Sequence, residues 1–270
     1  MKKTLFIVVV LVLVAAFGIS AFMVGDYLVE GKKQANRYDE LSEIANGQTT
    51  QAETAESTEA ATEAETEARV ESTRPTGTGG MLPGYDEIYE LNNHTVGWIK
   101  MEGTQMDYPV MQTPDEPNYY LYRNFDKRDS ARGSIYAREV CDLSEPSDNI
   151  TLYGHNMADG SMFACLHSYI NKSAWERNSL IFFDTLYEYH TYKIFAVFKT
   201  SANIGEGFSY HQFVDAANEK EFNDFVSTCK ELAFYDTGIT PVYGDKLICL
   251  STCEYTLDNG RLVVAAVRIT

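Results

Sequence analysis

Short apolar runs separated by turn-forming residues fill the chain from residue 96 to residue 269, and they constrain the fold more than any other feature. Short strands at such spacing are typical of a β-barrel or a β-sandwich. A helix is expected over 219–233, where apolar residues recur at helical spacing after a capping pair, Asn218 and Glu221. A second helix is expected over 161–170. The strand-like runs are 96–101, 106–112, 133–137, 149–154, 179–184, 189–202, 246–252 and 261–269.

The N-terminus carries a long apolar run, from Leu5 to Val24, directly after Lys2 and Lys3. About 20 apolar residues in a helix span about 30 Å, the thickness of the hydrocarbon core of a membrane. The run is longer than the apolar region of a cleaved signal peptide, which has about 7–15 residues. We therefore predict an uncleaved membrane anchor over 1–25, with a cytoplasmic N-terminus and an extracellular remainder.

Residues 26–81 are predicted to connect the anchor to a folded domain over 82–270. The first part, 26–45, is compatible with a short amphipathic helix. Over 48–80 the chain is rich in Glu, Thr and Ala, and glutamates such as Glu59 and Glu63 recur four residues apart, where they would repel one another on a helix. This composition predicts a disordered linker that holds the domain away from the membrane, although a tail without such a role fits equally well.

The net charge and the cysteine content argue against some classes of function. The net charge of −17 argues against nucleic acid as a partner, because phosphate binding needs clustered Lys and Arg. The five cysteines form no metal-binding pattern, so we expect no metal and no cofactor. Cys249 and Cys253 lie on one expected strand, about 13 Å apart, which is too far for a disulfide. At least one free thiol is therefore expected.

The last two expected strands bring a cysteine and an arginine together. Cys253 ends one strand, Arg261 starts the next, and the turn signal Asp258-Asn259-Gly260 lies between them. Both residues are expected at the same end of the sheet. A nucleophilic thiol needs a proton partner and a group that stabilises an oxyanion, and arginine can do the second task.

Histidine is the expected proton partner, and His155 is the best placed of the five. It follows the apolar strand NITLYG and starts the polar turn HNMADGS, a position that presents a side chain for function. A turn or capping role for His155 fits these residues equally well. The other four histidines lie in a polar turn, in surface segments or in an aromatic loop.

Two segments resemble the signatures of a known family. TLYGHNMADGSMFA (151–164) and LSTCEY followed by GRLVVAAVR (250–268) are similar to the two signature segments of the sortases. YPVMQ (108–112), NYYLYRNFD (118–126), GSIYA (133–137) and the helix expected over 219–233 are similar to the class B branch. The resemblance covers about residues 84–270.

The resemblance implies a cysteine transpeptidase on an eight-stranded β-barrel with N-terminal helices. Cys253 would attack the carbonyl after the Thr of a C-terminal sorting signal on a secreted surface protein, and form a thioester. His155 would be the general acid and base and Arg261 the clamp for the oxyanion or the substrate backbone, while Ser251 and Thr252 would contact substrate. An amine of a cell-wall precursor, or a pilin lysine, would resolve the thioester.

Three alternatives stay open on the residues alone. The enzyme could polymerise pilins, it could be a secreted cysteine peptidase in which water resolves the thioester, or the domain could be a non-catalytic surface module with core cysteines. Glu254 follows the thiol directly, and a nearby carboxylate disfavours a thiolate. Alternation along the strand predicts that Glu254 points to the opposite face from Cys253.

Overall fold

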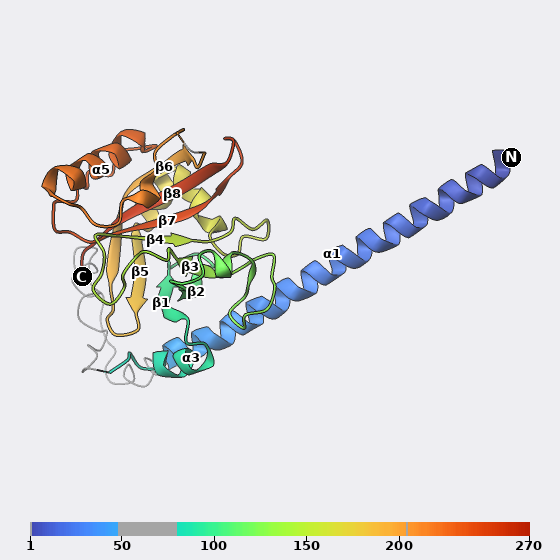
Figure 1. Ribbon diagram of the computed structural model, residues 1–270, viewed down its shortest axis with the longest axis horizontal. Coiled ribbons are helices and arrows are strands. Elements are labelled where there is room, and N and C mark those ends of the chain that lie inside the picture. Colours follow the sequence, from blue (N-terminus) through green and yellow to red (C-terminus); the bar gives the residue numbers. More distant parts are fainter. Residues whose placement is uncertain (1, 48–79, 204) are drawn as a thin grey trace, which may run out of the picture. The chain divides into compact units, whose positions relative to one another are not determined.

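The computed structural model describes residues 2–47, 80–203 and 205–270 (Figure 1). It divides the chain into two compact units, Met1–Glu40 and Leu41–Thr270. Helix α1 runs without a break over Lys2–Gly47, so the two segments expected over 1–25 and 26–45 are one continuous helix. Residues 48–79 of the expected linker lie outside the described residues.

The first unit consists of most of α1, and its apolar residues face outward. Large side chains such as Phe6, Leu11, Phe17 and Phe22 are more than half exposed. By length and composition, the stretch Val10–Asn46 qualifies as a candidate membrane span. Outward apolar side chains all around a helix of this length are suited to lipid contact.

Eight strands form a closed barrel in the second unit, so the predicted mainly β fold is confirmed. The order around the barrel is β1-β2-β3-β4-β7-β8-β6-β5. Every strand overlaps an expected run to within a few residues. The strands are β1 (Thr95–Lys100), β2 (Asp107–Met111), β3 (Ile135–Ala137), β4 (Asn149–Tyr153), β5 (Leu180–Thr185), β6 (Thr191–Ser201), β7 (Leu247–Glu254) and β8 (Gly260–Arg268).

One helix precedes the first strand, and further helices lie in the connections between later strands. They are α3 (Tyr85–Leu91), η1 (Tyr119–Tyr122), η2 (Ala164–Ile170), α4 (Lys172–Arg177), η3 (Tyr210–Gln212) and α5 (Glu219–Leu232). The helix expected over 161–170 is wrong at its start, because it begins at Ala164 as a 3-10 helix. Met162 has a φ of 57°, a left-handed conformation that a helix cannot contain, so residues 161–163 belong to the preceding loop.

The strand pairings decide which residues meet at one end of the barrel. β7 pairs with β8 as an antiparallel hairpin, and it pairs with β4 in parallel on its other side. A parallel pair cannot be joined by a tight turn. Here the connection from β4 to β7 includes β5, β6 and α5, which lie between them in the sequence.

Helix α5 covers the outer face of β6, β7 and β8 (Figure 1). Its first turn is capped by Asn218, whose Oδ1 accepts from the backbone N–H of Glu221 at 3.1 Å, as predicted. Cys229 of α5 is fully buried against Cys249 and Val263 of the sheet, which confirms it as a core thiol. One face of β7, which carries Leu247 and Cys249, therefore packs against α5. Side chains alternate along a strand, so Ser251 and Cys253 lie on the same face.

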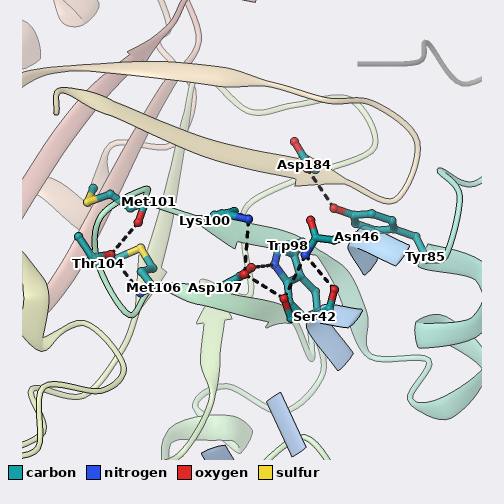
Figure 2. A network of polar contacts seen from close by, with 10 residues as sticks. All are labelled: Ser42, Asn46, Tyr85, Trp98, Lys100, Met101, Thr104, Met106, Asp107 and Asp184. Atoms are coloured by element: carbon teal, nitrogen blue, oxygen red, sulfur yellow. Dashed lines mark hydrogen bonds and ion pairs between the residues drawn. The ribbon is translucent and has the colours of Figure 1, made fainter. Parts of the chain in front are cut away.

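A cluster of polar contacts around the partly buried carboxylate of Asp107 joins the end of α1 to the barrel within the second unit (Figure 2). Asp107 accepts from Trp98 Nε1 at 2.5 Å and from Ser42 Oγ at 2.9 Å, and it lies 3.6 Å from Lys100 Nζ. Charge-assisted hydrogen bonds of this kind are stronger than neutral ones. The cluster is a fixed attachment of the last turns of α1 to strands β1 and β2.

Candidate active site

The hairpin β7–β8 places Cys253 directly opposite Arg261. The two residues are partners in the antiparallel register, near the end of β7 and the start of β8. Both belong to the outward-facing rows that α5 covers further along the strands, at Cys249 and at Val263. Cys253 lies beyond that cover and is partly exposed, whereas Cys249 is fully buried. The expected proximity of Cys253 and Arg261 is present in the structure.

The parallel pair β4–β7 places His155 on the other side of Cys253. The register ends at Tyr153 opposite Ser251, and Gly154 N–H donates to the Ser251 carbonyl at 3.2 Å. His155 therefore follows at the level of Cys253. Three residues thus form a row across neighbouring strands, or their immediate extensions, at one end of the barrel. In order across the sheet they are His155, Cys253 and Arg261.

The residue before His155 has to be glycine for a packing reason. A Cβ at Gly154 would lie 2.7 Å from the ring of Phe163 and 2.5 Å from Cδ1 of Ile135. Such contacts are far closer than van der Waals packing permits. The close approach lets the loop after β4 fold back, and Phe163 N–H donates to the His155 carbonyl at 3.0 Å.

The His155 ring is held on one nitrogen by a main-chain carbonyl. Nε2 lies 2.8 Å from the carbonyl oxygen of Leu121, and the ring centroid lies 5.6 Å from that of Tyr122. A carbonyl oxygen can only accept, so Nε2 carries the proton and donates. In a neutral ring Nδ1 is then the basic nitrogen, and it is the atom that can take a proton from a thiol.

Three of the remaining thiols, Cys141, Cys229 and Cys249, are buried, whereas Cys165 is partly exposed, as is Cys253. All five cysteines lie within the described ranges and carry free thiols, as at least one was expected to do. Burial raises the pKa of Cys141, Cys229 and Cys249, and it raises the pKa of Cys165 to about 11. These four groups are thiols, not thiolates, at neutral pH.

The surroundings of Arg261 contain neutral phenols. Burial raises the pKa of the Tyr136 phenol, and it raises the pKa of Tyr210 to about 12. The positive charge of Arg261 lowers both pKa values, but by less than burial raises them. Nη1 of Arg261 donates to the carbonyls of Asn259 at 3.2 Å and Gly260 at 2.9 Å, within its own turn. A guanidinium has five N–H donors, so this anchoring leaves further donors for a substrate oxygen.

Ser251 and Thr252, predicted to contact substrate, are both 2% exposed and point to opposite faces of β7. The Ser251 hydroxyl lies 2.6 Å from the hydroxyl of Tyr210. The hydroxyl of Thr252 has no hydrogen-bond partner among the described residues. Ser251 is thus part of a buried pair behind Cys253, and Thr252 faces the barrel interior.

Glu254 is turned away from the thiol, as strand alternation predicted. Its carboxylate accepts from Lys199 Nζ at 2.8 Å and from the backbone N–H and hydroxyl of Thr256 at 3.0 Å and 2.8 Å. Burial opposes ionisation of Glu254, but these hydrogen bonds outweigh it and lower the pKa of the carboxyl. The negative charge is therefore compensated on the face opposite Cys253.

Two further residues contact the main chain of Cys253, and the sequence did not point to them. Asn156 Nδ2 lies 3.3 Å from the Cys253 carbonyl oxygen, and His167 Nε2 lies 3.1 Å from the same atom. His167 had been expected in a surface segment, yet it is partly buried on η2. No periodicity connects it with Cys253, since 86 residues separate them.

Comparison with known proteins agrees with the geometry. The sortase domain family matches residues 99–269. Sortase B of Listeria monocytogenes is 30% identical over 187 residues, 68% of this chain and 73% of the relative. Sortase B of Staphylococcus aureus is 29% identical over 186 residues, 68% of this chain and 74% of the relative.

A solved structure shows the same fold. The Staphylococcus aureus sortase B–substrate complex superposes with a TM-score of 0.71 at 24% identity, over 90% of this chain and 99% of that chain. The barrel fold, the family match and the two relatives all indicate the same family. The chain therefore belongs to the sortase family of cysteine transpeptidases and, by its relatives, to class B.

Proposed function

We propose that the protein is a membrane-anchored class B sortase that joins secreted surface proteins to an amine of a cell-wall precursor. The observation that carries this proposal is the register of β4, β7 and β8, which brings His155, Cys253 and Arg261 side by side. A nucleophile, a base and an oxyanion donor in one row are the parts that acyl transfer through a thioester requires.

In the proposed first step, Cys253 Sγ attacks the main-chain carbonyl carbon of the Thr of a sorting signal. Nδ1 of His155 takes the thiol proton, since its Nε2 is held by the Leu121 carbonyl. Arg261 donates to the oxyanion of the tetrahedral intermediate. The C–N bond then breaks, His155 gives its proton to the leaving amine, and the acyl group stays on sulfur as a thioester.

In the second step, the amine of the acceptor attacks the thioester carbon and the C–S bond breaks. His155 takes a proton from the attacking amine, and a proton returns to Cys253 Sγ. Ser251 and Thr252 stay predicted substrate contacts. Both side chains are buried, so direct contact with a substrate would require a rearrangement at this end of β7.

The N-terminal helix supplies the proposed anchor. Its apolar side chains are exposed, and Lys2 and Lys3 precede them, which favours a cytoplasmic N-terminus and an extracellular catalytic domain over 82–270. The acidic segment between helix and barrel would act as a spacer of the plasma membrane from the wall. No nucleic acid and no cofactor takes part in this proposal.

The test uses the soluble domain, a library of sorting-signal peptides of the Asn-Pro-x-Thr-Asn kind, and an amine acceptor. Mass spectrometry should detect a thioester on Cys253 and an amine adduct of the peptide. Cys253→Ala should abolish both, while the control Cys165→Ala should keep both, because desolvation raises the pKa of the Cys165 thiol to about 11 and keeps it protonated at neutral pH.

Other outcomes favour the alternatives. Products formed only with a pilin lysine would indicate fibre assembly, and hydrolysis that ignores added amine would indicate a peptidase. If no peptide in the library acylates Cys253 and thiol probes label none of the five cysteines selectively, the domain is a non-catalytic module and the proposal fails.

A further inference from the structure

The main-chain hydrogen bonds between β4 and β7 end before they reach the carbonyl of Cys253, the proposed nucleophile. Gly154 N–H donates to the Ser251 carbonyl at 3.2 Å, so the Ser251 carbonyl points toward β4. Along a strand, alternate carbonyls point to the same neighbour, and the next one on this side belongs to Cys253. β4 ends at Tyr153, and the chain then turns away into the loop that contains His155.

Two side chains take the place of the missing main-chain donor. Asn156 Nδ2 lies 3.3 Å and His167 Nε2 lies 3.1 Å from the Cys253 oxygen, and the two nitrogens are 3.0 Å apart. A buried carbonyl without a partner is costly, so these contacts have an energetic reason. They come from two separate elements, the loop after β4 and the helix η2.

The amide of Asn156 has one favourable orientation in this cluster. With Nδ2 toward Cys253, its two N–H groups can bind the carbonyl oxygen and Nε2 of a neutral His167. The reversed amide would place Oδ1 against the carbonyl oxygen, where two acceptors repel. When Nε2 of His167 carries the proton, its own N–H can donate to the carbonyl. The Cys253 oxygen therefore has a donor whichever ring nitrogen of His167 carries the proton.

Asn156 is joined to His155 by a peptide bond, so its side chain connects the two proposed catalytic residues. We propose that Asn156 and His167 are positioning residues for the transpeptidase reaction: they hold the main-chain carbonyl of Cys253 and thereby fix Sγ relative to the His155 ring. This inference rests on the roles proposed above for Cys253 and His155. The loop is itself fixed, since Phe163 N–H donates to the His155 carbonyl.

The experiment compares Asn156→Asp with Asn178→Asp in the full-length protein. Asn178 is a matched control, because its Nδ2 donates to the Glu102 carbonyl at 2.9 Å on an exposed part of the barrel. Asn156→Asp keeps the shape, removes the donor and adds a negative charge near the thiol, so Asn156→Leu, which removes the donor without adding a charge, has to show the same loss. We expect kcat for transfer to fall on the order of tenfold or more, with KM within about twofold, since a small misplacement of a catalytic group reduces the rate steeply.

The second arm changes His167. His167→Gln retains an N–H donor and should keep most of the wild-type kcat, whereas His167→Leu retains only the volume and should lose several-fold. This pair decides the question even if Asn156→Asp folds poorly. Wild-type kcat in Asn156→Asp, or equal loss in both His167 variants at unchanged melting temperature, would overturn the proposal.

A substrate-independent readout separates this inference from the proposed function. The rate at which iodoacetamide alkylates Cys253 should fall several-fold in Asn156→Asp and stay at the wild-type value in Asn178→Asp. If wild-type protein forms no thioester with any sorting peptide, the proposed function fails, and the alkylation rates still decide whether Asn156 positions the sulfur. Equal alkylation rates in wild type and Asn156→Asp would contradict the positioning role.

Discussion

The ion pair between Lys199 and Glu254, the residue after the proposed nucleophile Cys253, gives a stability prediction that can be worked from the structure. The Glu254 side chain is 4% exposed and that of Lys199 is 23% exposed, and their charged atoms are 2.8 Å apart. In Lys199→Met, one carboxylate oxygen loses its donor, while the other keeps both donors of Thr256. Removing one partner of a buried pair costs about 3–5 kcal/mol, and removing a hydrogen bond to a charged group costs about 1.5–3 kcal/mol.

We expect Lys199→Met to cost about 2–3 kcal/mol, because Thr256 still compensates part of the Glu254 charge and Lys199 is only partly buried. For a domain of this size that corresponds to a fall in melting temperature of about 5–10 °C. Urea denaturation of the soluble domain at pH 7, followed by circular dichroism, measures the free energy directly. Lys220→Met is the control, since its pair with Asp224 is exposed on α5.

The pH dependence of this variant follows from the pKa of Glu254. Because the folded protein lowers that pKa, Glu254 contributes stability above the pKa of the unfolded chain, about 4.3, and the contribution is lost as the pH falls through the lowered value. The difference between wild type and Lys199→Met should therefore be complete at pH 7 and shrink below about pH 4. A difference below about 0.5 kcal/mol at pH 7, or one that stays constant on acidification, would refute the reasoning.

Three further predictions concern the site and its loops. Arg261→Lys should lower kcat on the order of tenfold or more in the peptide-transfer assay, because lysine lacks the two-pronged donor. Tyr210→Phe should cost about 1–2 kcal/mol in urea denaturation, because it leaves the buried Ser251 hydroxyl without its partner at 2.6 Å. Asp159→Asn removes the charged partner of the buried Arg132 guanidinium, and should cost about 1–3 kcal/mol in the same denaturation assay.

Each of these three expectations has a clear contrary result. Near-normal transfer by Arg261→Lys would remove the clamp role. Unchanged stability of Tyr210→Phe would mean that the buried Ser251 hydroxyl needs no partner. Wild-type stability of Asp159→Asn would show that further contacts of Arg132, such as the hydroxyl of Ser161 at 2.9 Å, are sufficient to stabilise its guanidinium.

The strands and the hairpin could be predicted because their signals are local. Apolar alternation marks β1 to β8 to within a few residues, and the Asp258-Asn259-Gly260 turn makes Cys253 and Arg261 neighbours by chain length alone. His155 could be selected as a histidine at a strand end. In these places residues close in sequence determine the geometry.

The pairing of β4 with β7 could not be predicted in the same way. Both strands are apolar runs, and no feature of either run names the other as its partner; the closure of the barrel decides it. The support of the Cys253 carbonyl by His167 was missed for the same reason. The left-handed Met162 and the late start of η2 also depend on how the loop packs under Gly154, which local propensity does not describe.

The mixed pairing of β7 has a consequence for biogenesis. Cys253 and Arg261 meet through a hairpin turn, which a chain can close early, but His155 reaches Cys253 only after β5, β6 and α5 have been threaded into place. If the domain is exported as proposed, a chain that emerges in N-to-C order carries the proposed base, His155, before the proposed nucleophile, Cys253. Under the proposed mechanism, a chain whose last two strands have not yet paired with β4 could not form a thioester with substrate.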